Sequence, residues 1–460
     1  MKHIHFIGIC GVAMSALALA FKRQGWRVTG SDAGFYPPVS TELKKNGVDF
    51  YPGWHPEKMG RPDLVVVGNV AGSHNPEWLY VQSEKLNYKS YPEVIREFFV
   101  KENSIVAAGT YGKSTATALL AWILTQAGGE PSYMFGGLSL NDLPAAQLGA
   151  GQWSVVEGDE YKSSRWDNGP KFAYYQPTHL LLTSVVWDHA DVYPTDQSYV
   201  EAFQQLVDAV PPTGLMVVAE NAWPRLKFNT KNQARLITYG RGETNTYRYA
   251  RASYSTTGVS FDILKGPEVY HVACPVLGEY MADKITGCFA LGDAIGIKPA
   301  AIISAISTFK GMKRRLEKRF ENEVTVFDDI ARSPVKAQGV LESLRKIYAK
   351  KIIAVFEPNT GNRRPQARTW YDGAFAAADE VVIPHLTKIK KEPGHETEYL
   401  EGDQLTELIA RTQPHVRYIP DDEQAVAYLK QIAAPGDVIV FLGSHGWRGM
   451  IEKLVEQMKD

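Results

Sequence analysis

The sequence predicts an α/β protein of three domains: a Rossmann-like first domain, a central domain of the P-loop ATPase-like type and a second Rossmann-like domain. The chain has 460 residues, which is too long for one hydrophobic core. Short apolar strands alternate with helix-forming runs. Two strands run into glycine-rich turns that open helices, at residues 8–15 and 109–114. We place the domains at 1–103, 104–314 and 315–460.

The composition narrows the class of protein further. Hydrophobic residues make up 44% of the chain and charged residues 22%, as in a soluble globular protein. A net charge of −1 gives no reason to expect nucleic acid or an anionic membrane as a partner. No apolar run is long enough to span a bilayer, and Met1 leads directly into a strand. The three cysteines are far apart, which indicates reduced thiols in a cytoplasmic protein.

The first domain opens with a βαβ pattern: a strand at 3–7, a helix that runs through residue 21, and a strand at 26–29. Cys10 and Ala13 stand where a dinucleotide-binding turn has its second and third glycines. The hypothesis of an NAD-dependent oxidoreductase would depend on this turn alone and would leave the rest of the chain unexplained. The turn therefore predicts a diphosphate-sized anion site at a helix N-terminus.

Two polar residues of the first domain follow predicted strands. Asp32 ends the second strand, near the place of a ribose or a similar polyol. Asn69 ends a strand at 62–69, at the edge where open α/β sheets bind ligands. Taken alone, Asn69 is as consistent with a loop contact as with ligand binding.

The central domain begins with a phosphate cradle. A strand at 104–108, the turn Gly-Thr-Tyr-Gly-Lys-Ser at 109–114 and a helix at 116–126 follow one another. Glycines let backbone N–H groups face an anion, and the helix N-terminus adds partial positive charge. Lys113 can reach the β- and γ-phosphates of a nucleotide, and the Ser114 hydroxyl can bind Mg²⁺. Ala107 replaces the first glycine of the longer P-loop, and a plain strand-to-helix turn is the alternative.

Glu157 and His189 follow two further strands, predicted at 153–156 and 180–186. The carboxyl ends of parallel strands meet at one edge of a sheet, so both side chains are expected near the phosphate cradle. Glu157, His189 and Ser114 are candidate ligands of Mg²⁺. Taken singly, Glu157 could be a surface acid and His189 a solvated loop residue.

The sequence of the third domain predicts a second doubly wound unit. Strands are expected at 324–327, 351–356, 380–383 and 437–442, and a helix is expected to start at Pro334. Arg315 precedes it in a basic hinge. An arginine can stabilise the charge of a transferring phosphoryl group, whereas a solvated linker charge is the alternative reading.

These motifs together resemble the Mur ligases of bacterial cell-wall synthesis over nearly the whole chain. Within that family, the stretch from Glu-Gly-Asp-Glu-Tyr to Asp-His-Ala-Asp is similar to the murein peptide ligases. UDP-N-acetylmuramate–L-alanine ligases usually have Asp-Glu-Ser and Asp-His-Met-Asp there. The residues that carry the resemblance are 8–11, 28–32, 36–41, 109–114, 157–161, 171–175, 188–191, 314–317 and 356–358.

The resemblance implies roles for particular residues. The nucleotide would be ATP, with Lys113 on its phosphates, Arg315 on the γ-phosphate and Asp329 on the ribose. Mg²⁺ would be held by Ser114 and Glu157, and a second Mg²⁺ by His189. The catalytic set would be Lys113, Glu157, His189 and Arg315. The full ATP-binding set is Gly109, Thr110, Tyr111, Gly112, Lys113, Ser114, Thr115, Arg315 and Asp329. The UDP-sugar-binding set is Gly8, Cys10, Gly11, Val12, Ala13, Met14, Ser15, Asp32 and Asn69.

The activity implied is ATP-dependent amide ligation through an acyl phosphate. The acid would be UDP-N-acetylmuramate and the amine the peptide L-Ala-γ-D-Glu-meso-diaminopimelate. An L-alanine acceptor is the second hypothesis, and a catalytically silent UDP-sugar-binding paralogue is the third. The third is favoured by Met281 and Lys284, which stand where the family has two asparagines that contact adenine. The intact phosphate and metal residues favour the first two.

Overall fold

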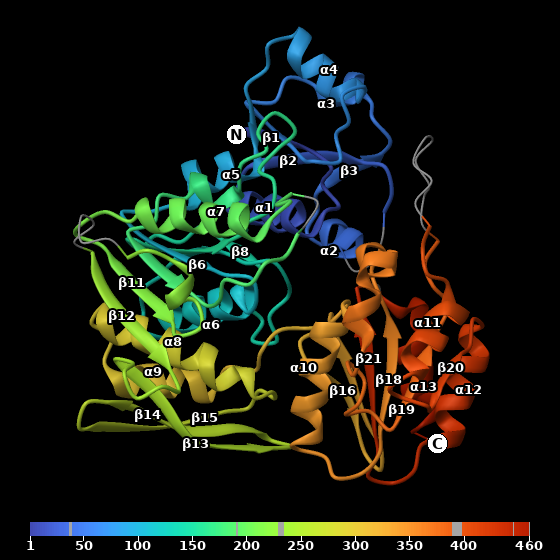
Figure 1. Cartoon of the computed structure of the whole chain (residues 1–460). Coiled ribbons are helices and arrows are strands. Elements are labelled where there is room, and N and C mark those ends of the chain that lie inside the picture. The colour runs from blue at the N-terminus through green and yellow to red at the C-terminus, as the bar shows by residue number, and fades with distance from the viewer. Residues whose placement is uncertain (36–38, 190–191, 229–233, 389–397, 445, 460) are drawn as a thin grey trace. The chain divides into compact units, whose positions relative to one another are not determined.

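The computed structural model describes residues 1–35, 39–189, 192–228, 234–388, 398–444 and 446–459. Residues 36–38 and 190–191, which belong to two of the motifs quoted above, lie outside the described residues, as does His445. The structure confirms the α/β class, with three separate sheets (Figure 1). The chain forms two compact units, one of residues 1–252, 260–274 and 282–310 and the other of residues 253–259, 275–281 and 311–460. None of the described helices is long and apolar enough to cross a membrane.

The first sheet has five parallel strands in the order β3-β2-β1-β4-β5. Every residue of the two central strands, β1 and β4, is buried, as expected for a sheet covered on both faces. The strands are β1 (His3–Ile7), β2 (Arg27–Asp32), β3 (Asp49–Pro52), β4 (Leu64–Val67) and β5 (Tyr88–Ser90). The helices are α1 (Val12–Arg23), α2 (Val39–Lys45), α3 (Pro56–Met59), α4 (Pro76–Ser83), α5 (Tyr91–Val94) and the π-helix η1 (Ile95–Phe99).

The second sheet has ten strands in the order β15-β14-β13-β12-β11-β10-β6-β9-β7-β8. Its strands are β6 (Asn103–Ala108), β7 (Ser132–Met134), β8 (Ala146–Gln147), β9 (Trp153–Gly158), β10 (His179–Leu182), β11 (Leu215–Ala219), β12 (Arg235–Gly240), β13 (Tyr247–Ser255), β14 (Gly258–Lys265) and β15 (Glu268–Cys274). Its helices are α6 (Lys113–Gln126), η2 (Lys171–Tyr174), α7 (Asp196–Asp208), η3 (Trp223–Arg225), α8 (Tyr280–Ala294) and α9 (Pro299–Ser307). The parallel strands β10, β6 and β9 are neighbours, so their carboxyl ends share one edge.

The third sheet has the order β16-β17-β21-β18-β19-β20, with only β16 antiparallel to its neighbour. Its strands are β16 (Glu317–Glu321), β17 (Thr325–Asp329), β18 (Ile352–Glu357), β19 (Glu380–Ile383), β20 (Val416–Tyr418) and β21 (Val438–Gly443). Its helices are α10 (Pro334–Arg345), η4 (Thr360–Arg363), η5 (Pro365–Tyr371), α11 (Gly402–Ala410), α12 (Asp422–Ile432), η6 (Trp447–Gly449) and α13 (Met450–Gln457). As predicted, α10 starts at Pro334.

The strand expected at 180–186 is shorter in the structure and ends at Leu182. Thr183 and Ser184 leave the ladder because their side chains and main chain bind the loop after β6. Thr183 donates its hydroxyl to the carbonyl of Tyr111 at 2.6 Å, and the N–H of Thr110 donates to the carbonyl of Ser184 at 3.1 Å. The apolar pattern of residues 180–186 could not show that Thr183 and Ser184 bond to the loop after β6.

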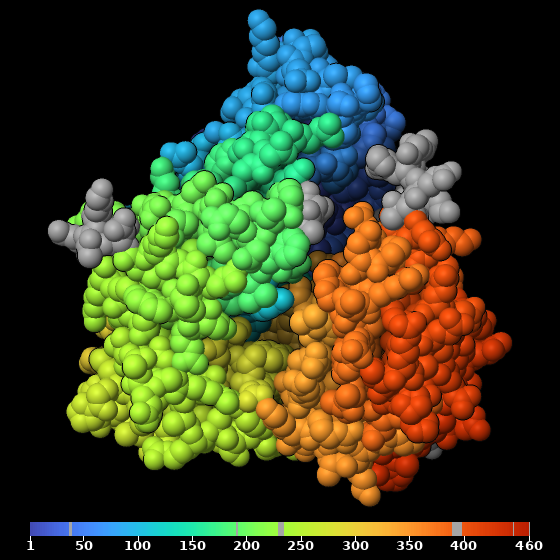
Figure 2. All heavy atoms as spheres, viewed as in Figure 1, coloured from blue at the N-terminus to red at the C-terminus, as the bar shows by residue number. Residues whose placement is uncertain are grey.

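The helices of the first segment pack against the central segment within the first compact unit. Gln24 donates to the carbonyl of Leu148 at 3.0 Å, and the rings of Trp78 and Trp166 stack with centroids 5.2 Å apart. Figure 2 shows the blue atoms of the first segment meeting the green atoms of the central segment. Ligand groups held by both segments can therefore meet within one unit.

A buried polar cluster inside the first domain ties α4 to three strands. The Glu77 side chain is fully buried. It accepts hydrogen bonds from Ser31, from Tyr51 at 2.8 Å and from the N–H of His55 at 2.8 Å, and Nε2 of His5 lies 3.7 Å away. Burial alone would raise the pKa of Glu77, but these contacts outweigh it and lower the pKa. Glu77 is therefore a buried carboxylate that stabilises the fold in its charged form.

Glu77→Gln is expected to lower the free energy of unfolding at neutral pH by about 1–3 kcal/mol, because an amide cannot accept all of these bonds. The folded-state pKa of Glu77 is lowered, so its contribution is complete above the unfolded pKa and is lost as pH falls through the folded pKa. Denaturant unfolding from about pH 7 to about pH 3 should show the two proteins converging in acid. The control Glu84→Gln removes a more exposed carboxylate paired with Arg61 and should change stability by less than about 0.5 kcal/mol. Equal stabilities of wild type and Glu77→Gln at every pH would contradict the prediction.

Candidate active site

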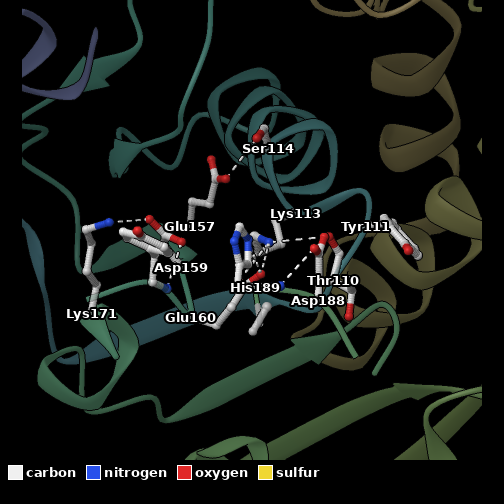
Figure 3. A network of polar contacts seen from close by, with 12 residues as sticks. Thr110, Tyr111, Lys113, Ser114, Glu157, Asp159, Glu160, Lys171, Asp188 and His189 are labelled. Carbon is white, nitrogen blue, oxygen red and sulfur yellow. Dashed lines mark hydrogen bonds and ion pairs between the residues drawn. The ribbon is translucent and has the colours of Figure 1, made fainter. Parts of the chain in front are cut away.

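The glycine-rich turn between β6 and α6 forms a tight loop beside a group of charged side chains (Figure 3). Gly109 has a φ of 136°, and Gly112, which caps α6, has a φ of 82°. A methyl group built on Gly109 would lie 2.3 Å from Oγ1 of Thr183, so this position accepts no side chain. The first turn of α6 has no side-chain cap and no acidic residue. Its N–H groups and its dipole are therefore open to an anion.

Side chains next to β10 fix the shape of this loop. Thr110 donates its hydroxyl to the carbonyl of Val186 at 2.8 Å and accepts from the N–H of Val186 at 2.9 Å. The N–H of Tyr111 donates to the hydroxyl of Ser184 at 3.0 Å. Burial, together with the nearby Asp188, raises the pKa of Tyr111 to about 12, so its phenol stays neutral. Thr115 is buried in the first turn of α6. The loop is held in shape by bonds within the protein.

Lys113 forms a buried ion pair with Glu160, a residue that sequence reasoning did not select. Its Nζ lies 3.1 Å from Oε1 and 2.8 Å from Oε2 of Glu160. The exposed fractions of the two side chains are 13% and 1%. Burial alone would lower the pKa of Lys113, but the carboxylates of Glu160, Asp159 and Glu157 outweigh it and raise the pKa. Lys113 therefore stays positively charged at neutral pH.

Ser114 and Glu157 lie together, as the sequence predicts. Ser114 donates its hydroxyl to Oε1 of Glu157 at 2.8 Å, and the N–H of Gly136 donates to Oε2 at 2.6 Å. Burial raises the pKa of Glu157, although Lys113 opposes the shift. Glu157 is the fifth residue of β9, with its side chain at the carboxyl edge of the sheet. The two oxygens are hard ligands of the kind that Mg²⁺ prefers.

His189 lies beside Glu160, the partner of Lys113. Its φ is 56°, and its Nε2 is 3.6 Å from Oε1 of Glu160. Its ring packs edge-on against Tyr161 at 5.3 Å. The structure thus places His189 with the Lys113–Glu160 pair. Across the described ranges, no three His, Cys, Asp or Glu side chains are arranged so that they could hold a metal ion by themselves.

Asp159 and Lys171 are two further charged residues of the site that the sequence analysis did not assign. Lys171 forms an ion pair with Asp159 (Figure 3). Burial would raise the pKa of Asp159, but Lys171 and Lys113 outweigh it and lower the pKa. The sequence does contain a sign of Asp159 and Glu160, because both belong to the acidic stretch that starts at Glu157. Lys171 is brought back to the site only because the chain between Tyr161 and Lys171 folds on itself, with a 3.1 Å backbone bond between its ends.

The ionic balance of the group is negative. Three carboxylates, those of Glu157, Asp159 and Glu160, face two ammonium groups, those of Lys113 and Lys171. A divalent cation would reverse this balance and leave the loop attractive to phosphate. The donor set therefore fits Mg²⁺ shared between the protein and a phosphate ligand.

The turn after β1, where the sequence predicts an anion site, leads directly into α1. Gly8 has a φ of 89°, Gly11 caps α1, and Val12 is exposed. Asp32 accepts from the N–H of Cys10 at 2.8 Å and from that of Ala33 at 2.7 Å, which binds its carboxylate to the turn itself. The hydroxyl of Ser15 donates to the carbonyl of Val12 at 3.0 Å and so closes the first turn of α1.

A cavity of about 230 Å³ joins this turn to the charged group. One wall is formed by the start of α1 and the end of β4, including Asn69, whose amide lies 3.5 Å from the carbonyl of Lys162. The opposite wall carries Glu157, Asp159 and Lys171. The remaining lining residues are Ala13, Met14, Val67, Gly68, Tyr91, Met134, Gly136 and Ser163. A ligand in this cavity would touch both predicted sites at once.

The other two candidate residues, Arg315 and Asp329, belong to the second compact unit. Asp329 is buried and accepts from the N–H groups of Leu316 at 2.7 Å and Ala331 at 2.8 Å. Burial raises the pKa of Asp329, and Arg315 opposes that shift. Arg315 lies between Arg314 and Leu316, which both have positive φ values, of 57° and 47°. The aspartate therefore holds a bent backbone around Arg315.

Three family models match the chain in order. Residues 3–102 match the Mur ligase family, catalytic domain; residues 107–292 match the Mur ligase middle domain; and residues 314–445 match the Mur ligase, glutamate ligase domain. Together they span most of the chain.

Individual relatives agree with these models. A UDP-N-acetylmuramate–L-alanyl-γ-D-glutamyl-meso-2,6-diaminoheptandioate ligase of Escherichia coli is 31% identical over 98% of this chain and 97% of its own length. A UDP-N-acetylmuramate–L-alanine ligase of Desulfitobacterium hafniense is 28% identical over 96% of this chain and 97% of its own. The crystal structure of a murein peptide ligase from Psychrobacter arcticus aligns with a TM-score of 0.71 and 25% identity over 100% of this chain and 99% of that one. A UDP-N-acetylmuramate–alanine ligase from Thermotoga maritima gives a TM-score of 0.80 at 22% identity, over the same shares of the two chains, which supports the fold. The chain belongs to the Mur ligase family.

Proposed function

We propose that this protein is an ATP-dependent ligase that joins the carboxylate of UDP-N-acetylmuramate to the amine of L-alanyl-γ-D-glutamyl-meso-diaminopimelate. The observation that carries the proposal is the cavity that links the glycine turn after β1 to Glu157, next to the phosphate loop. An acid anchored by a diphosphate on one wall would present its carboxylate to the charged group on the other. The name of the E. coli relative supports the choice of acid and amine.

ATP and Mg²⁺ fit the residues that are present. The N–H groups at the start of α6 and the ammonium of Lys113 would hold the phosphates, and Ser114 and Glu157 would hold the metal, with His189 proposed for a second ion. Mg²⁺ would supply positive charge that lets one anion attack another. In the second unit we propose Arg315 for the γ-phosphate and Asp329 for the ribose. Each Asp329 oxygen keeps a second lone pair for a hydroxyl donor.

The proposed reaction has two steps. A carboxylate oxygen of the acid attacks the γ-phosphorus, the bond to the bridging oxygen breaks, and ADP leaves, giving an acyl phosphate. The free amine then attacks the acyl carbon, and phosphate leaves from the tetrahedral intermediate while the nitrogen gives up its proton. Lys113 stabilises the charge that develops on the phosphoryl oxygens in the first step.

The first domain would hold the UDP group. The turn from Gly8 to Ser15 would take the diphosphate, because the capping glycine of α1 carries no side chain that competes for the N–H groups. Asp32 and Asn69 would contact the sugar portion. Since ATP and a UDP-sugar are metabolites of the cytoplasm, we propose that the protein works there, with no nucleic-acid partner.

Lys113→Ala is expected to reduce phosphate release with UDP-N-acetylmuramate and the tripeptide by at least about 10²-fold, because it removes a charge aimed at the transferring group. The measurement is phosphate release at saturating MgATP. Lys310→Ala, which removes an exposed lysine, is the control and should keep wild-type turnover. Undiminished activity of Lys113→Ala would exclude the proposed role of the loop.

Glu157→Gln is expected to raise the Mg²⁺ concentration needed for half-maximal activity by roughly tenfold or more, because an amide oxygen binds a divalent cation less strongly than a carboxylate. Titration of activity with Mg²⁺ at fixed ATP measures the shift. A variant with an unchanged Mg²⁺ requirement would remove Glu157 from the metal site.

Turnover with a panel of amines separates the three functional hypotheses. We expect phosphate release to depend on the tripeptide. Release with free L-alanine and not with the peptide would move the protein to the L-alanine-ligase reaction. Release with no amine, while UDP-N-acetylmuramate still binds, would favour a silent sugar-nucleotide-binding paralogue.

A further inference from the structure

Lys284, on the second turn of α8, lies directly against the phosphate loop. A methyl group built on Gly112 would lie 2.2 Å from Cε and 2.6 Å from Cδ of Lys284, and 3.5 Å from its Nζ. The lysine stem therefore fills the space that a side chain at residue 112 would occupy. Its ammonium lies close to the glycine that starts α6 and opens the loop to an anion.

The ammonium is mostly shielded from water, and the acidic neighbour found for it among the described residues is Asp283. Nζ of Lys284 lies 3.2 Å from Oδ2 of Asp283, and the two side chains are 10% and 17% exposed. A buried lysine is costly unless a negative group faces it. Three ammonium protons exceed what a single carboxylate contact satisfies, so the group retains the capacity to serve a second anion.

The position of Lys284 is fixed by the packing of α8. The thiol of Cys288, one turn further along α8, lies 3.6 Å from the carbonyl of Ala116 in α6. A methyl group built on Gly287 would lie 2.6 Å from the ring of Tyr239, so α8 also packs closely on β12. The close contact with Gly112 is therefore a property of two packed helices.

We propose that Lys284 is a second cation of the nucleotide site. Its contribution to binding affinity increases with the number of phosphates on the ligand. This rests on the proposed function, in which the loop holds ATP. Lys113 approaches the loop from α6, and Lys284 approaches it from α8. An ammonium is a point charge that recognises phosphate without reading the base. The residue is thus a determinant of selectivity for triphosphates over monophosphates.

Lys284→Met separates charge from packing, because methionine keeps an unbranched stem against Gly112 and removes the ammonium. We expect the Kd for MgATP to rise by about tenfold, that for ADP to rise less, and that for AMP to change little. Inorganic tripolyphosphate, which has no base, should lose affinity in parallel with ATP. Calorimetric titration measures these values, and Lys284→Arg should retain most of the affinity.

Asp283→Asn gives a test of opposite sign. If the charge of Lys284 acts on phosphate, removing its carboxylate partner should tighten ATP binding. Lys310→Met is the matched control, since it removes an exposed lysine of the same compact unit and should leave every Kd unchanged. Thermal melting confirms that each variant is folded.

The outcomes are distinct. A Kd for ATP unchanged in Lys284→Met makes the lysine a space-filling residue and overturns the inference. An equal loss for ATP, ADP and AMP, or weaker ATP binding in Asp283→Asn, indicates a structural role for the pair and also overturns it. Failure of the wild-type protein to bind MgATP at all overturns the proposed function itself, which the variants do not test.

Discussion

The buried ion pair between Lys113 and Glu160 is the interaction on which the arrangement of the site depends. Both side chains are almost completely shielded, so loss of either one leaves an uncompensated charge, at a cost of roughly 3–5 kcal/mol. The pair also connects the loop after β6 to the chain beyond β9 and to His189 beyond β10. Glu160 is held in turn by the phenol of Tyr199, at 3.4 Å from Oε1. A phosphate bound by Lys113 must share or replace this partner, so the pair keeps the lysine charged and placed before a ligand arrives.

The parallel order β10-β6-β9 supplies the geometry that the pair needs. In register, Ala108 lies beside Leu182 on one side and Gly158 on the other, so the three chains leave the sheet at the same level. The loop from β6 gives the proposed phosphate contacts, the chain from β9 gives the carboxylates, and the chain from β10 gives the histidine. The cavity then extends this edge to the first domain, through Asn69 and the start of α1. The first compact unit therefore holds both the loop and the carboxylates of the proposed site.

Family membership and the particular residues of this chain carry different information. The three matched domains account for the architecture. Met281 and Lys284 contribute at the level of individual side chains. Met281 is almost completely buried, whereas Lys284 leads back to the phosphate loop. At residue 284 the chain therefore places the positive charge of a lysine next to Gly112, the glycine that caps α6.

Sequence alone determined the α/β class, the glycine-rich turn between β6 and α6 and the closeness of Ser114 to Glu157, because glycine spacing and strand-to-helix order are local patterns with a fixed geometric result. It also marked the turn from Gly8 to Ser15, where a helix begins without a competing cap. Only the tertiary structure decided that Glu160, and not Glu157, pairs with Lys113, that Lys171 returns to Asp159, and that Lys284 meets Gly112. These contacts join segments 12 to 172 residues apart, and their partners are chosen by burial and packing. The order of residues along the chain does not show which of several similar carboxylates will pair with a given lysine.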